Sequence, residues 1–126
     1  MSENIELFES YTAKTLGELY STFPIPSDFN FFDFIPKLEY EEFLTHQLNA
    51  YHTINYLKNN HFLDFESMDL ESGKVKKAIL KPKALELLKQ DGLGVQLRKA
   101  LSTGRDELIR SIVNRALEMS LNLCFK

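Results

Sequence analysis

The hydrophobic positions in the first part of the chain follow a helical period. Apolar or tolerated side chains recur every three or four residues, as on one face of an α-helix. These positions are Ile5, Phe8, Thr12, Leu16, Leu19 and Phe23. The pattern predicts a helix from about Asn4 to Thr22. Pro24 and Pro26 end it, because proline lacks the backbone N–H and disfavours helical conformation at the preceding residue.

An aromatic segment follows these prolines. Ser27 and Asp28 are suitable helix N-caps, and Pro36 provides a stop, so we expect a short second helix over Phe29–Ile35. Its rings point in too many directions for one narrow stripe. They either fill the core or form an exposed patch for a protein partner. The candidate interaction residues are Phe29, Phe31 and Phe32.

A third helical pattern covers Glu41 to Asn60. Its apolar positions are Phe43, Leu44, Leu48, Tyr51, Ile54 and Leu57. Its other face carries Gln47, Asn49, Thr53, Asn55, Tyr56 and Asn59. The pair Asn59-Asn60 is suited to a left-handed stop at the C-terminal end, because asparagine tolerates that conformation better than most residues.

Two extended runs come next. Residues 62–70 and 75–80 alternate partially between apolar and polar side chains, as strands do. The sequence Glu-Ser-Gly-Lys lies between them, and its Gly73 supplies the backbone freedom of a tight turn. These runs predict a small antiparallel hairpin.

The rest of the pattern is helical. Pro82 suits the first turn of a helix that ends at Asp91-Gly92, and further helices are expected over Val95–Leu101 and over 105–123. The last has a broad apolar stripe, which packs either on the first helix or on a second copy as a homodimer. We therefore expect one domain over 1–126, mainly α with a small antiparallel hairpin (α+β): a core of about 4–90 and a helical extension of about 94–124.

Composition places the chain among ordinary globular proteins. It has 126 residues, of which 44% are hydrophobic and 26% charged. No apolar run approaches the roughly 20 residues that span a bilayer, and the N-terminus lacks the pattern of a signal peptide. The single cysteine, Cys124, excludes an internal disulfide and lies among apolar neighbours that favour packing. These features predict a cytoplasmic protein without membrane contact.

The net charge of −3 conceals an asymmetry. Residues 1–73 carry 13 acidic and 3 basic side chains, a net −10, whereas residues 74–126 carry 5 acidic and 12 basic ones, a net +7. Such asymmetry indicates either two halves that complement each other within one domain or an external charged partner.

The order of helix, hairpin and proline-started helix over residues 41–90 resembles the winged-helix (helix-turn-helix) domain of small bacterial regulators. The resemblance lies in the run from Thr53 to Leu63, the hairpin, and the run from Ala78 to Leu88. Leu80, Pro82 and Lys83 match the motif that starts the following helix, although Lys81 stands where threonine is common and Ala84 where glycine is common. The first helix and the aromatic segment would then be the two preceding helices.

If the resemblance extends to double-stranded DNA, it implies a reading helix and a basic wing. The implied nucleic-acid-binding residues are Gln47, Asn49, Asn55, Lys58, Asn59, Lys74, Lys76 and Lys77. From Glu71 to Lys83 there are five lysines and one glutamate. Against DNA binding, the helix over Thr45–Asn60 has one lysine and no arginine, so its polar residues can equally be a solvated face.

No pattern in the chain indicates catalysis, a cofactor or a metal. His46 and His52 lie about 240° apart on a helix, and Gly92-Leu93-Gly94 lacks the third glycine and the preceding strand of a dinucleotide loop. The sequence thus predicts a non-enzymatic winged-helix-like protein. It is either a DNA-binding regulator or a protein-interaction module that uses the same scaffold without DNA.

Overall fold

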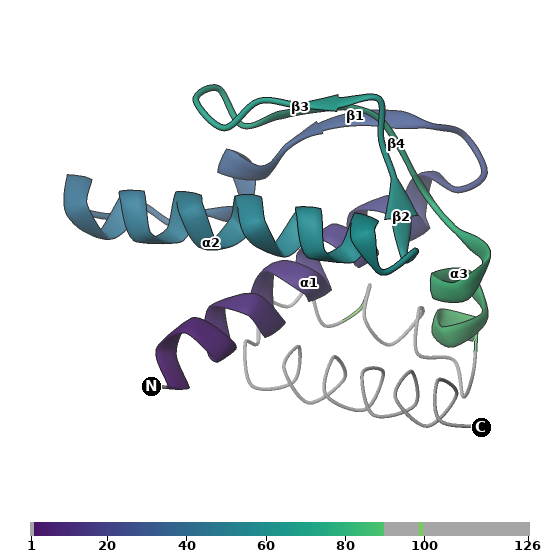
Figure 1. Cartoon of the computed structure of the whole chain (residues 1–126), viewed down its shortest axis with the longest axis horizontal. Coiled ribbons are helices and arrows are strands. Elements are labelled where there is room, and N and C mark those ends of the chain that lie inside the picture. Colours follow the sequence, from purple (N-terminus) through teal and green to yellow (C-terminus); the bar gives the residue numbers. More distant parts are fainter. Residues whose placement is uncertain (1, 90–98, 100–126) are drawn as a thin grey trace.

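The computed structural model describes residues 2–89 and residue 99 of the chain (Figure 1). Their elements are α1 (Ser2–Thr22), β1 (Ser27–Asn30), the 3-10 helix η1 (Phe31–Phe34), α2 (Tyr40–Asn59), β2 (Leu63–Asp64), β3 (Ser67–Met68), β4 (Lys74–Leu80) and α3 (Pro82–Lys89). The predicted α+β class is confirmed: the described part combines three α-helices with a small antiparallel sheet.

Strand β4 is the centre of the sheet. It pairs with β1 along one edge and with β2 and β3 along the other, always antiparallel. The predicted hairpin is therefore present, although its first strand is split into β2 and β3. Gly73 enters β4 with φ +79°, the left-handed conformation that its position in the predicted turn required.

The predicted helix over Phe29–Ile35 is wrong at its start, because Phe29 belongs to β1. The two expected caps have other roles. The Asp28 carboxylate accepts the backbone N–H of Lys77 in β4 at 2.9 Å, and the Ser27 hydroxyl lies 3.0 Å from that of Thr22. Asn30 is the actual cap: its Oδ1 accepts the Phe32 N–H at 2.9 Å and starts η1.

Helix α2 confirms the third helical pattern, but its left-handed residue is His61 (φ +67°), one position beyond the expected Asn59-Asn60 pair. The Phe62 N–H donates to the Leu57 carbonyl at 2.9 Å and the His61 N–H to that of Lys58 at 3.1 Å. This pairing is a Schellman motif, which satisfies the last carbonyls and turns the chain into β2.

The core lies where α1, α2, β4 and α3 meet. In Figure 1 the sheet lies over α2, and α1 passes beneath α2 and also contacts β4. The largest fully buried hydrophobic side chains are Tyr11, Leu19, Phe31, Ile54, Leu57, Leu63, Val75, Leu87 and Leu88. These come from both helical stripes, from the sheet and from α3, so one continuous core holds the described elements together.

Several expectations concern residues outside the described part. They are the helix end at Asp91-Gly92, the helix over Val95–Leu101 apart from residue 99, the helix over 105–123, the homodimer through the latter, and Cys124. Among residues 2–89 and 99, no helix has the length and apolar character needed to cross a bilayer.

Candidate functional site

Helix α2 exposes part of the face that was expected to be core. Ile54 and Leu57 are buried, but Leu44 and Leu48 are 36% and 48% exposed. Tyr56, which was expected on the opposite face, is 51% exposed. Tyr40, at the start of the helix, is 74% exposed. Tyr40, Leu44 and Leu48 are spaced by four residues, so they form an apolar strip on the first half of the helix, whereas Tyr56 lies about two turns further on, beyond the exposed His52. Exposed apolar side chains that gather in this way mark interaction surfaces more often than scattered ones do.

Two polar side chains of α2, those of Gln47 and Asn49, form hydrogen bonds with other parts of the fold. The Gln47 amide donates to the Leu70 carbonyl at 2.9 Å, which ties α2 to the turn of the hairpin. The Asn49 amide donates to the Asn4 carbonyl of α1 at 3.1 Å and accepts the hydroxyl of Thr53, a buried residue, at 3.1 Å. Gln47 and Asn49 therefore have structural partners that a DNA base would have to displace.

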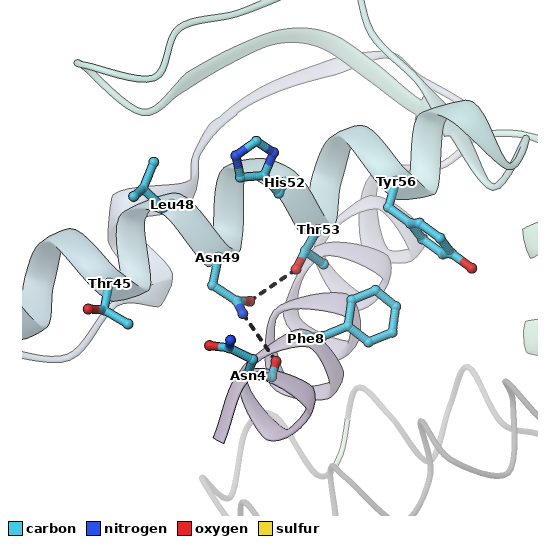
Figure 2. A pocket seen from close by; sticks show the side chains of 8 residues that line it. All are labelled: Asn4, Phe8, Thr45, Leu48, Asn49, His52, Thr53 and Tyr56. Atoms are coloured by element: carbon cyan, nitrogen blue, oxygen red, sulfur yellow. Dashed lines mark hydrogen bonds between the residues drawn. The ribbon is translucent and has the colours of Figure 1, made fainter. Parts of the chain in front are cut away.

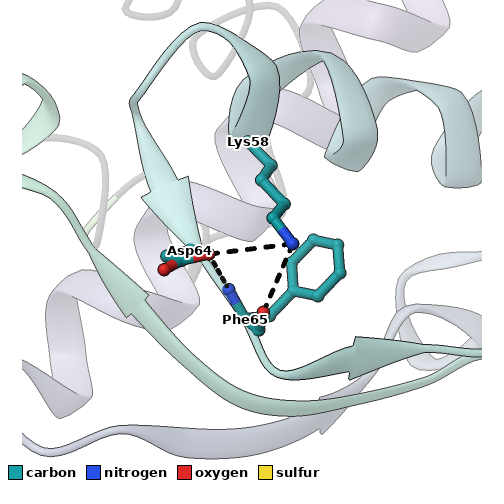
Figure 3. A network of polar contacts seen from close by, with 3 residues as sticks. All are labelled: Lys58, Asp64 and Phe65. Atoms are coloured by element: carbon teal, nitrogen blue, oxygen red, sulfur yellow. Dashed lines mark hydrogen bonds and ion pairs between the residues drawn. The ribbon is translucent and has the colours of Figure 1, made fainter.

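Lys58 is likewise engaged within the molecule. Figure 3 shows its ammonium group beside the ring of Phe65, 4.2 Å from the centroid, and close to Asp64. The Nζ atom lies 3.8 Å from the Asp64 carboxylate and donates to the Phe65 carbonyl at 3.4 Å. A cation over an aromatic face is stabilised by the ring quadrupole, so Lys58 helps to fix the segment between α2 and β3.

The remaining nucleic-acid candidates lie nearer the surface. Asn55 is half-buried and Asn59 is exposed, and the three β4 lysines are exposed. Lys76 and Lys77 are both exposed although they are consecutive in the strand, because β4 has a bulge: the register shifts opposite Asp28, and Lys77 adopts φ +53°. The Lys77 ammonium lies 3.4 Å from Glu66, while Lys74 and Lys76 complete the basic edge.

The three aromatic candidates for a protein contact are not equivalent. Phe31 is fully buried, which favours the core-filling alternative for this ring. Phe29 and Phe32 are half-buried against the core, where Phe29 stacks on Phe34 at 5.7 Å and Phe32 meets Phe43 edge-on at 5.2 Å. Neither ring projects as an isolated exposed anchor.

An open groove runs between α1 and α2 (Figure 2). It has a volume of about 670 Å³ and is lined by Asn4, Phe8, Thr45, Leu48, Asn49, His52, Thr53 and Tyr56. Phe8 and Tyr56 meet edge-on with ring centroids 5.4 Å apart. Leu48 and Tyr56, two of the exposed apolar residues of α2, are among the residues that line the groove.

A second α1–α2 contact fixes the two helices against each other. The buried Tyr11 hydroxyl lies 2.6 Å from Nδ1 of His46, and burial raises the pKa of this tyrosine above its ordinary value. The hydroxyls of Thr12 and Thr15 are also buried in this region, and neither has a hydrogen-bond partner among the described residues.

Sequence reasoning missed the exposed strip, although a signal for it was present. Apolar residues of α2 occupy more of the helix circumference than one buried stripe needs: Leu44 and Leu48 are displaced from Ile54 and Leu57 around the axis. Which part of a wide stripe stays exposed depends on the elements that cover it, and those become known only from the structure.

No group of three or more histidine, cysteine, aspartate or glutamate side chains in the described part is arranged to hold a metal ion. No protein-family model matches the chain, and no significant match is found among curated proteins or solved structures.

Proposed function

We propose that the chain is a non-enzymatic binding module with a winged-helix-like core, and that it acts by binding a protein partner on α2. The order α2, hairpin and proline-started α3 agrees with the pattern on which the resemblance rests, and α1 and η1 precede it. Winged-helix-like scaffolds are compatible with several functions, so the choice between these functions rests on which side chains are exposed on the surface.

The observation that carries the proposal is that α2 exposes apolar side chains while two of its polar side chains have partners within the fold. Leu44, Leu48 and Tyr56 are exposed, whereas Gln47 and Asn49, which a DNA-reading helix would present, bind the hairpin and α1. An apolar strip in contact with water favours association with another apolar surface. Phosphate backbones instead require cations, and α2 has only Lys58, which is engaged by Phe65 and Asp64.

The test compares proteins captured by the wild-type chain and by two surface variants from nuclease-treated lysate. We expect at least one partner to be retained by wild type and by the basic-edge variant Lys74→Glu/Lys76→Glu, but lost by Leu44→Gln/Leu48→Gln. Glutamine keeps helix propensity and removes the apolar contact without adding charge. Circular dichroism confirms that each variant is folded. Identical capture by Leu44→Gln/Leu48→Gln and wild type would refute the proposal.

Duplex DNA is the second candidate, favoured by the exposed lysines on β4. In that case binding depends on Lys74, Lys76 and Lys77, and affinity measured by fluorescence anisotropy decreases as salt increases. Lys76→Glu/Lys77→Glu should then weaken binding for every duplex sequence tested. Absence of salt-dependent binding, or equal affinity of this variant, would exclude the DNA function.

A further inference from the structure

We infer that the segment of the partner that binds α2 is a basic amphipathic helix lying in the groove between α1 and α2. Its apolar side chains contact Phe8, Leu48 and Tyr56, and its lysines or arginines lie near Glu41 and Glu42. This inference rests on the proposed protein-binding function and adds the chemistry of the bound segment.

The shape of the groove fits a helix. Both walls are helices, so the groove has no strand edge with free N–H and C=O groups to which an extended peptide could add. From Thr45 to Tyr56 the α2 wall is about 16 Å long at 1.5 Å per residue, which corresponds to about three helical turns. Among the described residues the groove is open to solvent, so it would leave much of a small molecule exposed to water.

The floor of the groove accepts apolar side chains at low cost. Its polar groups already bind each other: Asn49 donates to the Asn4 carbonyl and accepts from Thr53. The Thr53 hydroxyl and one amide N–H of Asn49 therefore keep a partner when an apolar group covers them. Phe8 and Tyr56 form one apolar end, and Leu48, which is 48% exposed, provides a further contact along the same wall.

The negative charge beside the groove favours a basic partner. Glu41 and Glu42 are exposed and lie one turn before Thr45 in α2, on the helix face that lines the groove. Neither residues 2–13 nor residues 40–57 contain a lysine or arginine. A cationic helix would thus meet carboxylates without cations of like charge on the two walls. A second copy of the chain would bring together two surfaces with only acidic charges on these helix segments, which disfavours a symmetric dimer here.

The test uses designed amphipathic peptides of about 18 residues, long enough for four to five helical turns. One has leucines on one face and lysines on the other. The second has the same leucines with glutamates, and the third contains the lysine peptide's residues in scrambled order. Binding of each labelled peptide to the full chain is measured by fluorescence anisotropy.

We expect the lysine amphipathic peptide to bind at least about tenfold more tightly than the other two, a difference of about 1.4 kcal/mol in binding free energy. Leu48→Gln should weaken this binding, and Glu41→Lys/Glu42→Lys should remove the preference for lysine over glutamate. The matched controls are Ile25→Gln, which changes an apolar residue 69% exposed outside the groove, and Glu18→Lys, which reverses an exposed charge elsewhere. Both controls should bind like wild type.

Equal affinity of the scrambled peptide would show that charge alone drives binding and would overturn the inference. An unchanged preference in Glu41→Lys/Glu42→Lys would also overturn it. Dimerisation in sedimentation velocity that Leu48→Gln abolishes would identify a second copy as the occupant, which contradicts it as well. If these results occur while capture of a partner still depends on Leu44 and Leu48, the protein-binding proposal stands and only the helix inference fails.

Discussion

Replacing Gly73 by alanine tests how firmly the tip of the hairpin is joined to the segment after β1. Gly73 has φ +79°, and an added Cβ would lie 2.7 Å from Cδ1 of Phe32 and against Oδ1 of Asn30. The same contact region contains three hydrogen bonds. The Asn30 amide donates to the Ser72 carbonyl at 3.0 Å, the Phe31 N–H donates to the Gly73 carbonyl at 3.0 Å, and Asn30 caps η1 through Phe32.

The expected loss of unfolding free energy follows from these contacts. A left-handed alanine costs about 1–2 kcal/mol. Displacing the Phe32 ring from a filled site costs about 1–3 kcal/mol, and weakening the Asn30 hydrogen bonds adds about 1 kcal/mol. Since these costs overlap, we expect Gly73→Ala to destabilise the protein by about 3 kcal/mol. Urea unfolding followed by circular dichroism measures the change, with an unchanged m-value indicating that the native fold is retained.

The matched control is Glu71→Ala, because this side chain is exposed in the same turn. It should change stability by no more than about 0.5 kcal/mol. A Gly73→Ala loss below about 1 kcal/mol would refute the reasoning, since the left-handed conformation alone accounts for that much. The hairpin tip would then move away from Asn30 without cost, and its docking would contribute little to the fold.

Three further substitutions test single interactions, each by urea unfolding. Thr15→Val should stabilise the protein by about 1 kcal/mol, because the buried Thr15 hydroxyl has no hydrogen-bond partner among the described residues and valine replaces it with a methyl group. A loss of stability would show that the hydroxyl has a partner. His61→Gly should stabilise by about 0.5–1 kcal/mol, because glycine adopts φ +67° without strain; destabilisation would contradict this. Tyr11→Phe should cost about 1 kcal/mol at neutral pH by removing the bond to His46. Burial raises the pKa of Tyr11 in the folded state, so the contribution of Tyr11 to stability is complete below the unfolded pKa of about 10 and decreases as pH rises above it. Above about pH 10 the unfolding free energy of wild type should therefore fall more steeply with pH than that of Tyr11→Phe. Equal pH dependence in the two proteins would contradict the assignment.

The parts of the fold that follow from local sequence were predictable. The period of α1 and α2, the proline at the start of α3 and Gly73 in the hairpin each specify structure through their own neighbours. Strand β1 was not predictable in this way. Ser27 and Asp28 are equally good as helix caps, and only the pairing with β4, about fifty residues later, makes them strand residues.

The candidate site was predictable only in outline, because its side chains depend on long-range contacts. Gln47 binds Leu70 only because the hairpin turn lies over α2, and Lys58 meets the Phe65 ring only because His61 turns the chain back. The same docking decides that Leu48 remains exposed. A helix with apolar residues around much of its surface leaves such choices open in the sequence.

The central position of β4 also has a consequence for the order of folding. Its contact with β3 joins Ser67 to Lys76, which are near neighbours in sequence, whereas its contact with β1 joins Ser27 to Ala78 across α2. Closing the longer loop costs about 1.5 kcal/mol more entropy, at about 0.6 kcal/mol for each doubling of length. The hairpin can therefore form as a local unit, and β1 completes the sheet when α1 and α2 have brought it close. Mutations in β1 should consequently accelerate unfolding more than they slow folding.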